Sequence, residues 1–164
     1  MDTFKWLLLS AVAVGIVGLL VRAAAHVTAP TQPKPVYERR PALLSKGEFA
    51  FYRVLLSAIE GSMVVMVKVG LSDLLKVPRG TAGEQALRNR VSQKHVDFVV
   101  CDEAGVRPLV VIELDDRSHR TEKARRRDAV KDAALAAAGL PLLRVPAARS
   151  YDAATLRQQI ADLQ

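Results

Sequence analysis

Apolar and polar positions follow different patterns in three successive parts of the chain. Residues 6–21, WLLLSAVAVGIVGLLV, carry no charge. Residues 28–42 contain four prolines and show no hydrophobic period, which is typical of a semi-extended tether. From Leu43 onward, helical and strand-like periods follow one another. Residues 43–164 are therefore predicted to form a folded α/β domain.

The uncharged run predicts an N-terminal membrane anchor over residues 1–27. Its length just suffices to cross a bilayer if Lys5 and Arg22 extend toward the headgroups. Because one basic residue precedes the run and four follow it closely, the positive-inside rule places the C-terminal domain in the cytoplasm, on a single-pass helix of the inner (cytoplasmic) membrane. The alternative is a secretory signal cleaved near Ala23–Ala25, which Arg22 disfavours because it separates the apolar run from that site.

Within the folded part, the periods predict a mixed sheet with helices on both faces. Two apolar runs separated by the turn DEAGVR predict a β-hairpin. The strand–helix–strand pattern that follows resembles a right-handed parallel crossover. The expected elements are a helix that starts with a capping box at Ser45–Glu48 and ends at Gly61, a strand Met63–Val69, short helical pieces within 70–92, strands His95–Cys101 and Pro108–Asp115, a helix Thr121–Ala138, a strand Leu140–Val145, and a last helix capped by Asp152.

Composition narrows the class of protein only slightly. The 164 residues have room for one domain of ordinary size, and the net charge of +7 allows a polyanionic partner without requiring one. Cys101 is the single cysteine, so neither a disulfide framework nor a cysteine-based zinc site is expected. We expect its side chain to pack as a small apolar group.

Three acids interrupt the two apolar runs of the predicted hairpin. Glu113 and Asp115 are two residues apart, so they point to the same face of their strand, and pairing of the strands brings Asp97 close to them. Carboxylates gathered beside buried strands repel one another unless a cation neutralises them. Hard oxygen ligands suit Mg²⁺ or Mn²⁺. The alternative is three solvated acids at strand ends.

The segments that carry these acids resemble a known family. KHVDFVVCD, LVVIELDDRSH and RRRDAVKDAALAAAGLPLLRVP closely resemble the bacterial domain of unknown function 2726, over roughly residues 43–151. That family is usually placed in the PD-(D/E)xK, restriction-endonuclease-like superfamily, near the very-short-patch-repair type of endonuclease. The resemblance implies a restriction-endonuclease-like α/β fold, a mixed sheet flanked by helices, here preceded by the N-terminal transmembrane helix.

The resemblance also implies a set of site residues. Asp97 and Glu113 match the two acids of the superfamily motif, as metal ligands, and Glu48 matches an acid that many members supply from the first helix. Asp115 stands where the motif has a lysine. In the repair-type branch an Asp and a following His often occupy this region, so Asp115 and His119 are candidates to replace the lysine. Asp115 is either a third ligand or a group that orients His119. The alternative to a functional role for His119 is a structural role.

Basic residues near the acids are candidates for contact with phosphate. Arg126, Arg127 and Lys131 follow the acidic cluster on the predicted helix, and Arg144 lies inside the last strand. The alternative for the helix residues is a solvated face. The eight aromatic residues show no interleaving with basic ones, so a stacking platform for single strands is not expected.

The sequence therefore predicts a membrane-anchored, Mg²⁺- or Mn²⁺-dependent nuclease-like domain that hydrolyses phosphodiesters, with nucleic acid, by analogy DNA, as its partner. Two other functions stay open. One is a catalytically inactive nucleic-acid-binding module, suggested by the missing motif lysine. The other is a membrane-tethered protein-interaction domain, suggested by the anchor and the tether.

Overall fold

The computed structural model describes residues 16, 36–59, 61, 63–115 and 122–164, with the side chains of residues 122–127 left aside. The chain divides into two compact units, Met1–Arg39 and Arg40–Gln164. The predicted anchor, residues 1–27, lies outside the described residues except for Ile16. Among the residues that are described, no helix is both long and apolar enough to cross a membrane.

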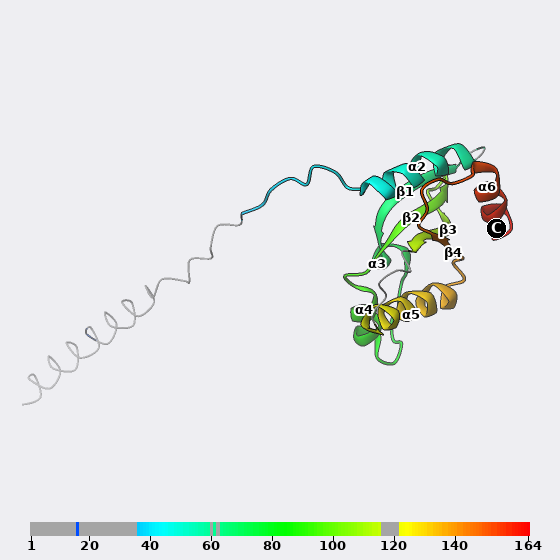
Figure 1. The fold of residues 1–164 in the computed structure, drawn as a ribbon. Helices are drawn as coiled ribbons and strands as arrows, with labels where there is room; N and C mark the ends of the chain where they lie inside the picture. The colour runs from blue at the N-terminus through cyan, green and yellow to red at the C-terminus, as the bar shows by residue number, and fades with distance from the viewer. Residues whose placement is uncertain (1–15, 17–35, 60, 62, 116–121) are drawn as a thin grey trace, which may run out of the picture. The chain divides into compact units, whose positions relative to one another are not determined.

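The unit Arg40–Gln164 has a mixed α/β fold, as the sequence predicts (Figure 1). Its elements are α2 (Lys46–Ala58), β1 (Met63–Gly70), α3 (Leu71–Leu74), α4 (Glu84–Val91), β2 (His95–Asp102), β3 (Pro108–Asp115), α5 (Glu122–Ala137), β4 (Leu142–Pro146) and α6 (Ala153–Ala161).

The four strands form one sheet in the order β1-β2-β3-β4. β1 pairs antiparallel with β2, and β2 pairs antiparallel with β3, which confirms the predicted hairpin. β4 runs parallel to β3, because helix α5 carries the chain back between them. β1, β3 and β4 therefore run in the same direction, and β2 runs opposite to them.

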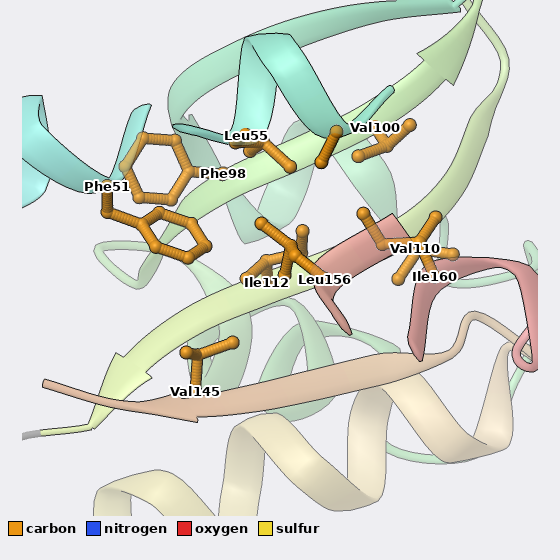
Figure 2. Close-up of a cluster of buried hydrophobic side chains, with 10 residues drawn as sticks. Phe51, Leu55, Phe98, Val100, Val110, Ile112, Val145, Leu156 and Ile160 are labelled. Carbon is orange, nitrogen blue, oxygen red and sulfur yellow. The ribbon is translucent and has the colours of Figure 1, made fainter. Parts of the chain in front are cut away.

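Helices cover both faces of the sheet, and each face has its own hydrophobic core. The first core, against α2 and α6, is drawn in Figure 2 and contains Phe51, Leu55, Ala58, Phe98, Val100, Val110, Ile112, Val145, Leu156 and Ile160. The second core, against α3, α4 and α5, contains Leu71, Val91, Val96, Val99, Cys101, Val111 and Leu135. Cys101 is a buried free thiol, as expected.

Capping interactions fix where the outer helices begin. Ser45 accepts a hydrogen bond from the Glu48 backbone N–H, and the Glu48 side chain accepts one from the Ser45 backbone N–H, which confirms the predicted capping box. Asp152 caps α6 by accepting from the Thr155 backbone N–H at 2.7 Å. The capping box also orients the Glu48 carboxylate, because one of its oxygens accepts the Ser45 backbone N–H.

Phe98 is the aromatic centre of the first core, so its truncation should be costly. Its fully buried ring stacks on Tyr52 with centroids 6.3 Å apart and lies 5.3 Å from the ring of Phe51. We expect Phe98→Ala to lower the free energy of unfolding by about 3–5 kcal/mol, since the surrounding helices cannot refill the space. Phe49→Ala is the matched control, because that ring is 54% exposed. Urea denaturation would measure both, and equal losses would contradict the packing seen here.

Candidate functional site

The candidate site lies where the alternation of side chains in β1 is irregular. Residues two apart in a regular strand share a face, yet Val67 packs against the first core and Val69 against the second. Between them, Lys68 has a φ of 53°, in the left-handed region that non-glycine residues rarely adopt. The alternation of side chains therefore inverts at Lys68.

The alternation of side chains in β2 inverts at Asp97, the residue opposite Lys68. Val96 belongs to the second core and Phe98 to the first, with Asp97 between them. The pairs that flank this point hold the two strands in register, so Lys68 faces Asp97 directly. Both strands thus break their alternation at the same place, where a cationic and an anionic side chain meet.

A row of charged residues crosses the sheet at this level. Asp97 lies one step beyond the paired residues of β2 and β3, which places it beside Glu113. Glu113 in turn is the register partner of Arg144 on β4. We call Lys68, Asp97, Glu113 and Arg144 the charged row. Side chains from the helices on either side of the sheet reach this row.

Lys68 joins the row to helix α2. Its Nζ lies 2.5 Å from Glu48 Oε1 and donates to Asp97 Oδ1 at 2.8 Å. The second carboxylate oxygen of Asp97, Oδ2, accepts the backbone N–H of Leu114 at 3.0 Å. This last bond ties Asp97 to β3, one residue after Glu113. Glu48 and Asp97 therefore share one ammonium group.

Lys131 joins the row to helix α5. Its Nζ lies 2.5 Å from Glu113 Oε1, and the two side chains are only 13% and 11% exposed. Further along β3, the buried Asp115 lies 4.0 Å from an Arg144 guanidinium nitrogen, and Arg144 also binds Asp132 on α5 at 2.5 Å. The pair of Glu113 and Lys131 is the least solvated of these contacts. We therefore expect the loss of either partner to change the stability of the folded unit most at this pair.

The surroundings shift the pKa values of the acids in opposite directions. Burial raises the pKa of Glu113 above its ordinary value, an effect that the bond from Lys131 offsets only in part, and the nearby Asp97 charge adds to the rise. Burial also disfavours ionisation of Glu48, but hydrogen bonds from Lys68 and Ser45 outweigh it and lower the pKa of that carboxyl. Burial opposes the charge of Lys68 as well, yet its bonds to Asp97 and Glu48 raise its pKa.

The acids offer hard oxygen donors to a cation, but lysines now neutralise them. Among the described residues, no three His, Cys, Asp or Glu side chains are grouped closely enough to hold a metal ion by themselves. Magnesium sites commonly use only one or two carboxylates, with water and substrate phosphate supplying the other ligands. Asp97 and Glu113 interact with each other and carry the right donor type. The donor set therefore fits Mg²⁺ or Mn²⁺.

The described residues form two sizeable cavities, and the smaller one is lined by sequence neighbours of Glu48 and Lys68. A cavity of about 670 Å³ between α4, α5 and the segment 75–81 is lined by apolar and basic side chains without a carboxylate. A second one, of about 560 Å³, is lined among others by Phe49, Tyr52 and Val67, the first next to Glu48 and the last next to Lys68. The larger cavity has no carboxylate, imidazole or thiol among its lining side chains. Glu48, Asp97 and Glu113 do not line the smaller one.

The structure brings together most of the residues predicted from the sequence. Glu48, Asp97 and Glu113 converge on the charged row, and Asp115 lies two residues further along β3. His119 lies outside the described residues, as do the side chains of Arg126 and Arg127. Lys131 and Arg144, predicted as phosphate contacts, form ion pairs with the acids.

Sequence reasoning missed Lys68. The signal was present, because Lys68 is the single charge within the apolar strand MVVMVKVG. A charged residue in a strand that both cores flank requires a partner, and here that partner is an acid pair.

One protein-family model matches the segment that carries the charged row. A family model described as "Protein of unknown function (DUF2726)" matches residues 40–163, three quarters of the chain and nearly all of the folded unit. The chain belongs to the DUF2726 family. Comparisons with curated proteins and with solved structures found no match. Membership in DUF2726 places the charged row inside the segment that the family shares.

Proposed function

We propose that the DUF2726 unit of this chain is a metal-dependent nuclease-like domain that hydrolyses phosphodiester bonds in nucleic acid. The observation that carries this proposal is the convergence of Glu48, Asp97 and Glu113 from a helix and two strands on one charged row. Carboxylates that are partly withdrawn from water need cations, and in this site Lys68 and Lys131 supply them.

The fold supports placing the family in the restriction-endonuclease-like superfamily. The sheet is mixed, helices lie on both faces, and the acids come from the first helix and from the hairpin. The two acids of the superfamily motif correspond to Asp97 and Glu113, which are neighbours across β2 and β3. A shared fold alone does not establish activity, so the proposal depends on the side chains.

Each residue has a defined role in this proposal. Asp97 and Glu113 bind the metal ion, and the Leu114 backbone N–H keeps the Asp97 carboxylate oriented. A divalent ion, when bound, neutralises charge on the phosphate and acidifies water. Lys131 supplies the cationic group that the motif lysine provides elsewhere, since its Nζ already lies beside Glu113. It positions the phosphate or the attacking water.

The N-terminal segment determines where this activity would occur. We propose that residues 1–27 anchor the chain in the inner membrane with the nuclease-like unit in the cytoplasm. The tether of residues 28–42 then gives the unit access to cytoplasmic DNA.

A second candidate function has one observation in its favour. Lys68 and Lys131 already neutralise the acids, so the charged row is also compatible with a structural role in a non-catalytic nucleic-acid-binding module. That module would bind DNA with a strong salt dependence and without divalent ions.

Calorimetry with Mg²⁺ and Mn²⁺ on the full chain in detergent tests the proposal. We expect binding of one divalent ion, alone or with a DNA duplex present, and loss of that binding in Asp97→Asn. The loss follows because the amide removes both the charge and one anionic oxygen donor. Glu103→Gln, in the exposed turn between β2 and β3, is the control. Salt-sensitive DNA binding without any divalent ion would instead support the non-catalytic module.

A further inference from the structure

Lys68 is held in its place at a measurable conformational cost. A lysine with a φ of 53° lies in the left-handed region, which is unfavourable for a residue with a Cβ atom. Such strain persists only where the surroundings impose it. Here the alternation of side chains inverts in β1 at Lys68 and in β2 at Asp97. The side chain that results is 33% exposed and ends between Glu48 and Asp97.

A metal ion bound to these oxygens would lie close to the ammonium. Nζ lies 2.5 Å from Glu48 Oε1 and 2.8 Å from Asp97 Oδ1. Mg²⁺ binds carboxylate oxygens at about 2.0–2.1 Å and carries twice the charge, so the two cations repel each other and compete for these oxygens. Lys131 differs, because it reaches Glu113 from α5, on the opposite side of the sheet from the α2 helix that carries Glu48.

We propose that Lys68 is a built-in counter-ion that competes with the divalent ion for Asp97. This inference rests on the proposed function, because it requires that Asp97 is a metal ligand. In the metal-free protein Lys68 keeps Glu48 and Asp97 close together in spite of their like charges. Binding of the metal ion displaces the ammonium toward solvent, which its partial exposure permits. Lys68 thereby lowers the affinity for metal and preserves the shape of the site.

Removal of the competing charge should strengthen metal binding. We expect Lys68→Met to lower the Kd for Mn²⁺ about tenfold or more, because a unit charge within a few ångströms is only weakly screened in a partly buried site. Lys68→Arg, which keeps the charge, should leave the Kd close to that of the wild type. Lys46→Met is the matched control. It also removes a lysine near Glu48, but Lys46 is an exposed residue of α2, the helix that carries Glu48.

The measurement is calorimetric titration of the full chain in detergent with Mn²⁺, with circular dichroism to verify the fold. If Lys68→Met alone does not fold, Glu48→Gln/Lys68→Met removes one acid together with one base and should bind Mn²⁺ more tightly than Glu48→Gln. A Kd for Lys68→Met that is unchanged or weaker, while the wild type binds in an Asp97-dependent manner, overturns the competition and leaves the metal site standing. Failure of both proteins to bind, with or without DNA, overturns the metal site and the competition together.

Discussion

Replacing Glu113 by glutamine should reduce metal-dependent DNA cleavage by on the order of a thousandfold. The carboxylate is one of two strand-borne metal ligands in the proposed site, and an amide offers a neutral oxygen in its place. The loss of several kcal/mol of metal-assisted stabilisation corresponds to a factor of this size. Cleavage of a labelled duplex by the full chain with Mg²⁺ or Mn²⁺, and with EDTA as the blank, would measure it.

The control for this prediction is another acid of the same region. Asp132→Asn removes a carboxylate on α5 that binds Arg144 and is about half exposed, so cleavage should persist. Circular dichroism must show that Glu113→Gln is folded. Full activity in a folded Glu113→Gln protein would exclude this carboxylate from the reaction.

The main helices and strands and the hairpin of β2 and β3 could be predicted from the sequence because each rests on a local signal. The capping box at Ser45 and Glu48, the turn between β2 and β3, and the period of each strand are all contained within a few residues. The approach of Asp97 to Glu113 followed from the hairpin register, since the two strands are joined by one short turn.

The ion pairs that the basic residues form could not be predicted because these contacts are long-range. Lys68 meets Glu48 and Asp97 across 20 and 29 residues, and Lys131 meets Glu113 across 18. The meeting of Lys68 with Asp97 further depends on a left-handed backbone conformation that nothing in the strand sequence indicates. A period of two predicts the wrong face for Val69, because the inversion at Lys68 shifts the alternation by one residue.

Replacing Lys131 by methionine should destabilise the folded unit by about 3–5 kcal/mol near neutral pH. The substitution leaves the Glu113 carboxylate, 11% exposed, without its closest cation, and an uncompensated buried charge is costly. The double variant Lys131→Met/Glu113→Gln should recover most of that stability, since neither member of the pair then carries a charge. Urea denaturation of the four proteins of this cycle would measure the coupling.

The pH dependence of the same variant has a defined sign. A carboxyl with a folded pKa above its unfolded pKa contributes stability below the unfolded value and loses it as the pH rises through the folded value. Burial already raises the pKa of Glu113, and loss of Lys131 removes the main group that opposes this rise. The destabilisation by Lys131→Met should therefore shrink from about pH 7.5 to about pH 4.5.

A loss below about 1 kcal/mol that does not change with pH would contradict this account, because it is the behaviour of a solvent-screened pair. A large, pH-dependent loss would establish that Lys131 and Glu113 form one electrostatic unit. Lys131 Nζ is then fixed beside the carboxylate before any substrate arrives, and a cation fixed in that way is what a phosphate-positioning group requires. The stability cycle therefore tests, without any substrate, whether Lys131 on α5 supplies the cation in place of the motif lysine, whose position on β3 is occupied by Asp115.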